Sequence, residues 1–194
     1  MDSKIKAYLT ELYQSYHADD QKQADRLNRW RSIEPESAEL LSVLISATQA
    51  KNLLEIGTSG GYSTLWLAEA AQQYGGHLTT LEIEADRIAT ATSHLKAVKL
   101  NEICDTLCID AADFLKNNQT VFDFILLDAE RPAYPSYWPD LKRALSKSGS
   151  LMVVDNVISH AAQVQDFIEL IRAETEFKHT ILPVGAGLLL VVKK

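Results

Sequence analysis

Acidic and amide side chains stand directly after two apolar segments in the second half of the chain. Asp128 follows FILL, and Asp155 and Asn156 follow LMVV. If both segments are buried parallel strands, their ends meet at one rim of a sheet, where ligands bind in open α/β folds. Carboxylate and amide oxygens suit Mg²⁺, which keeps positions open for water and substrate. The spacing therefore predicts a divalent cation site formed by Asp128, Asp155 and Asn156.

A glycine-rich turn follows the apolar segment LLEI. In EIGTSGGYS, Gly57, Gly60 and Gly61 permit a tight turn close to a ligand, and the helix predicted after them offers free N–H groups. A nucleotide-like ligand is predicted, although the spacing is not G-x-G-x-x-G. Glu55 would be unhelpful beside a pyrophosphate but favourable beside a cationic amino-acid group. Glu82, at the end of the next apolar segment, is placed to accept hydrogen bonds from a ribose diol.

Alternating strand and helix patterns must position these residues. Strands are predicted over residues 52–58, 77–83, 105–110, 122–129 and 149–157, and helices over 63–73, 85–99, 111–117, 134–145 and 163–173. Strands separated by single helices indicate a parallel sheet with helices on both faces. The last two strands, 177–183 and 187–194, have no helix between them. They are therefore predicted to form an antiparallel hairpin at one edge.

The N-terminal region is predicted to be helical. Helices are expected near Ser3–Tyr16 and Asp20–Arg31, and a third begins at Pro35. A length of 194 residues suits a single domain, here 1–194, in which residues 1–50 are expected to cover the ligand site of a core formed by 51–194.

Composition argues against several classes of protein. A net charge of −7 gives no electrostatic basis for binding nucleic acid or an anionic membrane. The charged N-terminus does not resemble a signal sequence and no apolar stretch is long enough to span a membrane, so a cytoplasmic protein is expected. Cys104 and Cys108 are the only cysteines. They are expected to share one face of a strand as small apolar side chains.

Taken together, these motifs resemble those of class I S-adenosylmethionine-dependent methyltransferases, and among them the cation-dependent O-methyltransferases of the catechol and caffeoyl-coenzyme A type. The resemblance extends from about Ile33 to the C-terminus. It implies a Rossmann-like α/β fold with a mostly parallel sheet of order 3-2-1-4-5-7-6 and a reversed C-terminal edge. It also implies S-adenosylmethionine as the methyl donor, Mg²⁺ as the cation and a small catechol-like, hydroxylated aromatic acceptor.

The resemblance assigns roles residue by residue. The implied metal ligands are Asp128, Asp155 and Asn156. The implied donor contacts are Ile33, Glu55, Gly57, Thr58, Ser59, Gly61, Ser63, Glu82, Asp110, Ala111 and Asp128. Relatives are often dimers; the amphipathic N-terminal helices could form such an interface or could cover the core of a monomer.

One catalytic position departs from the family. A lysine commonly stands three residues after the first metal aspartate and is assigned as the general base, but this chain has Arg131 there. Arginine stays protonated and cannot accept the proton. We therefore expect the cation at Asp128 to lower the pKa of the acceptor hydroxyl, and water or a carboxylate such as Glu130 to take the proton. Arg131 would hold the oxyanion or an acceptor carboxylate.

Other residues near these motifs have both a functional and a structural interpretation. His160 is expected to be solvated or to cap a helix, and at least two of Tyr134, Tyr137 and Trp138 to pack inside the fold, while Trp30 could line the acceptor mouth.

Three alternative functions remain open at this stage. The first is methylation of a hydroxylated tRNA uridine, with Arg26, Arg29 and Arg31 as the basic face. The second is an NAD-dependent dehydrogenase, which the missing G-x-G-x-x-G pattern opposes. The third is a non-catalytic protein that binds the donor.

Overall fold

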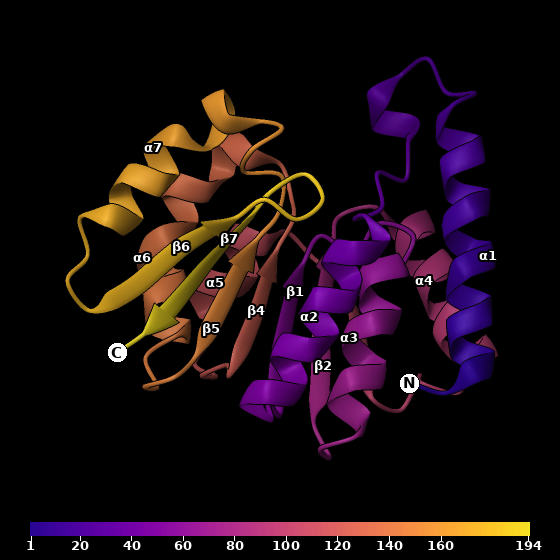
Figure 1. The fold of residues 1–194 in the computed structure, drawn as a ribbon, viewed down its shortest axis with the longest axis horizontal. Helices are drawn as coiled ribbons and strands as arrows, with labels where there is room; N and C mark the ends of the chain where they lie inside the picture. Colours follow the sequence, from indigo (N-terminus) through magenta and orange to yellow (C-terminus); the bar gives the residue numbers. More distant parts are fainter.

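Seven strands form one sheet in the computed structural model, which describes residues 1–194 (Figure 1). The strands are β1 (Asn52–Ile56), β2 (His77–Glu82), β3 (Cys104–Cys108), β4 (Phe124–Leu127), β5 (Leu151–Val154), β6 (Phe177–Leu182) and β7 (Leu188–Lys193). Their order is β3-β2-β1-β4-β5-β7-β6, and β7 alone runs in the opposite direction to the other six strands. The predicted strand order and the predicted hairpin are both confirmed.

Helices cover both faces of this sheet. They are α1 (Ser3–Asp20), α2 (Pro35–Thr48), α3 (Tyr62–Gln72), α4 (Ala85–Ala97), α5 (Ala111–Asn117), α6 (Tyr134–Ala144) and α7 (Ala161–Arg172). One hydrophobic cluster joins α1, α2, α3 and α4 to one face, and a second joins α5, α6 and α7 to the other. Figure 1 shows α1 beyond α4 on one side of the molecule and the β6–β7 hairpin on the other.

Burial on both faces explains the composition of the central strands. The four residues of β4 and the four of β5 are all buried. Alternate side chains of each strand enter opposite clusters: Phe124 and Leu126 pack with α2 and α3, while Ile125 and Leu127 pack with α6 and α7. Continuous apolar runs are what a doubly covered parallel strand requires.

The predicted helix over Asp20–Arg31 is wrong. The first helix instead continues to Asp20, and only a single 3₁₀ turn, Arg26–Asn28, follows. Asp20 explains the change, because its carboxylate accepts hydrogen bonds from the backbone N–H groups of Trp30 and Arg31 at 2.6 and 2.9 Å and so turns the chain back. Residues 21–34, which we call the strap, therefore cross the rim of the sheet without forming a long helix.

The expectation for the two cysteines is wrong in part. Cys104 is buried, as a small apolar side chain should be, but Cys108 is exposed. The difference arises because β3 is an edge strand, and most of its residues after Cys104 are exposed. No helix of the structure combines the length and the apolar character that a membrane crossing needs.

Candidate functional site

The register of the sheet brings three strand ends to one level. Ile56 of β1 is paired with Leu127 of β4, and Leu127 is paired with Val154 of β5. The next residues in each strand are Gly57, Asp128 and Asp155. The glycine turn and both aspartates therefore share one rim of the sheet, as their positions after buried strands predict.

Asp128, Asp155 and Asn156 are in contact at this rim. Asn156 Nδ2 donates to Asp155 Oδ2 at 2.7 Å and to Asp128 Oδ1 at 3.3 Å. Burial raises the pKa of both aspartates, and the negative charge of Asp128 raises the pKa of Asp155 further. Two ionised carboxylates held side by side away from water destabilise the folded state unless a positive charge offsets their repulsion.

This trio fits a divalent cation. Asp155 Oδ1 is buried and has no hydrogen-bond partner, so it is free to act as a ligand. Coordination by Asn156 would need its amide oxygen in place of Nδ2, which a half-turn of the amide provides. Nowhere do three or more His, Cys, Asp or Glu side chains gather into a metal centre, so this pair of carboxylates with one amide is the candidate set. Its oxygens suit Mg²⁺.

The glycine turn packs directly against the first aspartate. Gly57 has a φ of +107°, and a Cβ at this position would overlap the backbone carbonyl oxygen of Asp128. The next residues are fixed by β2, because the N–H groups of Gly57 and Thr58 both donate to Leu81 O, at 3.0 and 3.1 Å. Ser59 N then donates to Glu82 Oε2 at 2.9 Å. The turn and the predicted ribose-binding acid are therefore one unit.

Glu55 lies beneath this turn in a network of hydroxyl groups. Its Oε2 accepts hydrogen bonds from Thr64 Oγ1 and Thr80 Oγ1 at 2.5 and 2.6 Å, and Thr58 Oγ1 contacts Thr80 Oγ1 at 2.6 Å. Burial raises the pKa of Glu55 to about 7, although the hydroxyls of Ser63, Thr64 and Thr80 oppose the shift. Glu55 Oε1 is buried without a partner. The carboxyl group thus has hydrogen-bonding capacity that the chain itself does not use.

A cleft of about 1000 Å³ contains nearly all of the predicted site residues. Its lining includes Ile33, Gly57, Thr58, Ser59, Ser63, Glu82, Asp110, Ala111, Asp128, Arg131, Asp155 and Asn156. Two predicted donor contacts, Glu55 and Gly61, do not line it. Gly61 caps α3, and a Cβ there would lie 2.8 Å from Ala91 Cβ, so helix packing accounts for this glycine.

Arg131 is held at the side of the cleft that carries Asp128. It is only 5% exposed, and its Nε donates to Gln163 Oε1 of α7 at 2.8 Å. Glu130, by contrast, is paired with two arginines of the strap, Arg31 at 2.8 Å and Arg26 at 3.2 Å. The hydrogen bond and charge of Arg31 lower the pKa of Glu130. Glu130 is therefore a weak base, contrary to the role considered for it from the sequence.

The aromatic residues divide as expected between core and cleft. Tyr134 and Trp138 are buried and pack edge-on against Phe167, so these two belong to the core. Tyr137 and Trp30 both line the cleft.

His160 also lines the cleft, at the residue that precedes α7, and its side chain makes no capping hydrogen bond. Sequence reasoning missed two residues of the site. Arg87 lines the cleft and donates to Ser59 Oγ at 2.9 Å, and Gln163 accepts from Arg131. Both were missed because their contacts join segments that are distant in the sequence.

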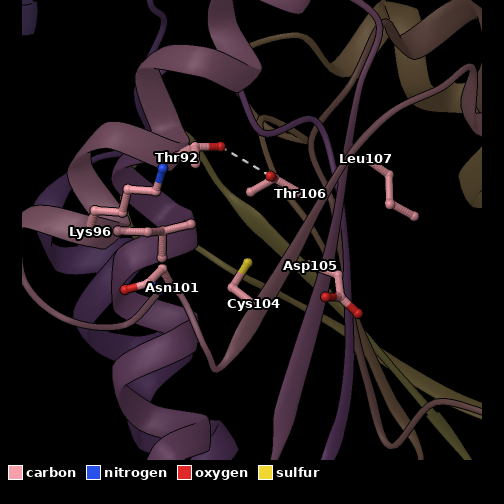
Figure 2. Close-up of a pocket in the computed structure, with 8 residues that line it drawn as sticks. Thr92, Lys96, Asn101, Cys104, Asp105, Thr106 and Leu107 are labelled. Carbon is pink, nitrogen blue, oxygen red and sulfur yellow. Dashed lines mark hydrogen bonds between the residues drawn. The ribbon is translucent and has the colours of Figure 1, made fainter.

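A second, smaller hollow of about 310 Å³ lies between α4 and β3 (Figure 2). Its lining includes Cys104 and Asp105, and its edge carries a 3.0 Å hydrogen bond between Thr92 and Thr106. Burial raises the pKa of the Cys104 thiol, which makes it unreactive. None of the predicted site residues lines this hollow.

Comparison with known proteins agrees with this geometry. The family model described as O-methyltransferase matches residues 5–194. A catechol O-methyltransferase of Niastella koreensis is 37% identical over 131 residues, which cover 66% of this chain and 58% of the relative. The chain thus matches under two thirds of the length of this curated relative.

Two solved structures cover the whole chain. An O-methyltransferase of Bacillus cereus in complex with S-adenosylhomocysteine is 28% identical, with a TM-score of 0.78 over 100% of this chain and 92% of the other. An O-methyltransferase of Streptomyces achromogenes in complex with S-adenosylmethionine, involved in tomaymycin synthesis, is 26% identical, with a TM-score of 0.81 over 100% and 91%. With the family match across nearly its full length, this chain belongs to the O-methyltransferase family.

Proposed function

We propose that this protein transfers a methyl group from S-adenosylmethionine to a hydroxyl group of a small catechol-like acceptor, with a divalent cation, Mg²⁺ first. The observation that carries the proposal is the convergence of Asp128, Asp155 and Asn156 at the rim that also holds the glycine turn. Fold alone would not identify the chemistry. Oxygen ligands suited to a cation, placed beside a glycine turn suited to the donor, support this reaction class.

The donor would lie along the turn between β1 and α3. Gly57 leaves the backbone open to a close approach, and Glu82 would accept hydrogen bonds from the ribose hydroxyls. Asp110 caps α5 by accepting from Ala112 N at 2.8 Å, and the backbone of Ala111 at the start of this helix would contact the adenine. Ile33 of the strap would cover the donor from the other side of the cleft. The bound donor and donor product of the two solved relatives support S-adenosylmethionine as the ligand of this cleft.

Asp128, Asp155 and Asn156 would hold the cation. A bound divalent cation favours the anion of a phenolic hydroxyl, whose ordinary pKa is about 10. Two vicinal hydroxyl groups match an ion that keeps positions open for substrate. The guanidinium of Arg131 lies at this end of the cleft, and its fixed charge would stabilise the oxyanion or an acceptor carboxylate.

The transfer itself needs alignment more than acid–base chemistry. An oxygen lone pair of the acceptor forms the new O–CH₃ bond while the C–S bond breaks, and the sulfur keeps the electron pair as a neutral thioether. The cleft's contribution is to hold both reactants in line. Neither Arg131, which stays charged, nor Glu130, which is paired with Arg26 and Arg31, is suited to accept the hydroxyl proton. Water in the open cleft is its acceptor in this proposal.

The alternative acceptor, a hydroxylated tRNA uridine, is not favoured. Two of the three arginines that could have formed a basic face, Arg26 and Arg31, are both engaged by Glu130. The third, Arg29, donates to the backbone oxygen of Gln23 at 2.8 and 3.0 Å. A homodimer stays a prediction, since a single chain does not test it.

The experiment is methyl transfer from labelled S-adenosylmethionine to 3,4-dihydroxybenzoate, with Mg²⁺ and then with excess chelator. We expect product only with the cation, and no product from 3-hydroxybenzoate, which lacks the vicinal pair. Asp155→Asn should lose transfer but still bind S-adenosylhomocysteine. Transfer that is unaffected by the chelator would overturn the role of the cation. Absence of transfer to every catechol tested, by protein that binds the donor product, would overturn the acceptor class.

A further inference from the structure

A chain of hydrogen bonds joins α1 to the glycine turn through α4. Tyr8 Oη lies 2.6 Å from His94 Nδ1, and Tyr16 Oη lies 2.9 Å from His94 Nε2. Tyr16 Oη also donates to the backbone oxygen of Gly60 at 2.9 Å. Two tyrosines of the N-terminal helix thus hold one histidine between them, and one of the two reaches the turn.

The direction of this chain follows from counting hydrogens. A carbonyl oxygen can only accept, so the single hydroxyl hydrogen of Tyr16 is used at Gly60. The hydrogen between Tyr16 and His94 must then come from His94 Nε2. Burial lowers the pKa of His94, which leaves Nδ1 without a hydrogen in the neutral ring. Nδ1 therefore accepts from Tyr8, and the chain runs from Tyr8 through His94 and Tyr16 to Gly60.

Packing fixes the same turn independently of these hydrogen bonds. A Cβ at Gly60 would lie 2.5 to 2.6 Å from the ring and hydroxyl atoms of Tyr16, so a glycine is needed where the ring rests on the turn. The ring of Tyr16 stacks on Trp30 of the strap with centroids 4.5 Å apart. Ser59 Oγ donates to Trp30 O at 2.5 Å. The turn is therefore held in place by contacts with both α1 and the strap.

The backbone conformation of Ser59 explains why the turn needs these contacts. Ser59 has a φ of +48°, a left-handed backbone that a residue other than glycine adopts only at a cost of roughly 1 kcal/mol or more. In that conformation its N–H reaches Glu82 Oε2. Without these contacts the turn would relax, and Glu82 Oε2 would lose its hydrogen bond from Ser59 N, leaving only the bonds from Ile83 N and Glu84 N to Oε1.

We propose that Tyr16 and His94 are positioning residues for the methyl donor: through Gly60 and Ser59 they hold the turn and Glu82 in the arrangement that binds S-adenosylmethionine. The inference rests on the proposed placement of the donor, and it adds a dependence on α1 that lies outside the cleft. Neither residue lines the cleft, so both act through the turn. Donor affinity should depend on them, whereas the rate at saturating donor should not.

The test compares two identical substitutions on one helix. Tyr16→Phe removes only the hydroxyl and should raise the Kd of S-adenosylhomocysteine, measured by calorimetry, about 3- to 10-fold, which is the net value of its hydrogen bond to the turn at Gly60. Tyr13→Phe is the control, because Tyr13 is also on α1 but its ring contacts are stacking on His17 and a tilted approach to Tyr62. It should leave the Kd unchanged. The KM of the donor should follow the Kd, with kcat changed less than about twofold.

Variants of His94 supply a rescue. His94→Leu removes the donor to Tyr16 and should weaken binding as Tyr16→Phe does, while His94→Gln keeps an N–H at a similar reach and should restore part of the affinity. If the Kd is unchanged in Tyr16→Phe and His94→Leu, or if the Kd rises equally in Tyr13→Phe, the role of Tyr16 and His94 is wrong, while the proposed donor site still stands. Wild-type protein that does not bind S-adenosylhomocysteine at all would instead overturn the donor site, and this inference with it.

Discussion

Two buried carboxyl groups at the site each have an oxygen without a hydrogen-bond partner, Glu55 Oε1 and Asp155 Oδ1. Buried polar atoms in folded proteins are nearly always paired, because an unpaired one costs about 1–3 kcal/mol. One of these oxygens lies under the glycine turn, and the other belongs to the second aspartate of the cleft. A cation bound by Asp155 would remove the second cost, whereas protonation of the carboxyl group reduces the cost of burying Glu55, which does not line the cleft.

The protonation of Glu55 should make stability depend on pH. Its pKa is about 7 in the folded chain because of burial, above the ordinary value of 4.5. A raised folded pKa means that the folded state holds the proton more tightly, so this stabilising contribution is complete below pH 4.5 and is lost as pH rises through 7. Glu55→Gln is neutral throughout. The free energy of unfolding of the wild type, minus that of the variant, should therefore fall by up to about 3 kcal/mol from pH 4.5 to 7.5.

Urea unfolding of both proteins at a series of pH values measures this difference. Thr64→Val is a useful companion, since it removes a hydroxyl that donates to Glu55 Oε2 and should raise the carboxyl pKa further. A difference that is constant across the range would show that folding does not raise the pKa of Glu55.

Residue types and spacing were sufficient to predict that Asp128, Asp155, Asn156 and Glu82 meet at one rim, because each stands at the end of a strand and parallel strands end at a common rim. They were insufficient for Glu55. Its position in β1 suggested a direct ligand contact, but a strand residue before the turn faces the packed side, where hydroxyls of α3 and β2 reach it. Which side chains from other elements lie nearby is not encoded in local spacing.

At the scale of elements, the turn between β1 and α3 depends on its approach to β4. Gly57→Ala should destabilise the protein by about 2–4 kcal/mol, because the left-handed φ is strained for alanine and the new Cβ overlaps the Asp128 carbonyl. Gly149→Ala is the matched control. Its φ is +85° but nothing lies within 4 Å of the new Cβ, so only the strain of about 1 kcal/mol is expected. Equal losses in chemical unfolding would mean that the close approach to Asp128 contributes nothing.

The strap is the element that sequence periodicity predicted least well. Most of its residues are polar or charged, and long-range contacts determine its path: Asp20 bonds to the backbone of Trp30 and Arg31, and Arg87 bonds to the backbone oxygens of Leu27 and Arg29. Such contacts cannot be read from local pattern. The Arg26 and Arg31 ion pairs with Glu130 then join the strap to the cation side of the cleft.

Glu130→Gln should loosen the strap without destabilising the fold. All three side chains are at least one third exposed, so each pair contributes at most about 1 kcal/mol to global stability. Trypsin should nevertheless cleave after the strap arginines several-fold faster, since cleavage reports local opening. Glu176→Gln, which removes the 2.8 Å pair with Lys193, is the control and should not change that rate. Cleavage at the wild-type rate in Glu130→Gln would mean that Asp20 and Arg87 hold the strap alone.

At the scale of the whole molecule, the cleft exists only when the strap, the turn and the strand ends are assembled. A donor that binds this cleft therefore stabilises the folded state by mass action, by about 2.7 kcal/mol at 100 times its Kd. For a chain of 194 residues that corresponds to a rise in Tm of roughly 5–10 °C.

S-adenosylhomocysteine should produce this rise in a thermal scan, and NAD at the same concentration should not. Glu82 could bind the ribose of either ligand, but the turn lacks the G-x-G-x-x-G spacing that a pyrophosphate needs. The reverse order would contradict the donor site and support a dehydrogenase. A rise with S-adenosylhomocysteine that disappears in Glu82→Ala would link it to this cleft, since Glu82 lines the cleft and orients Ser59.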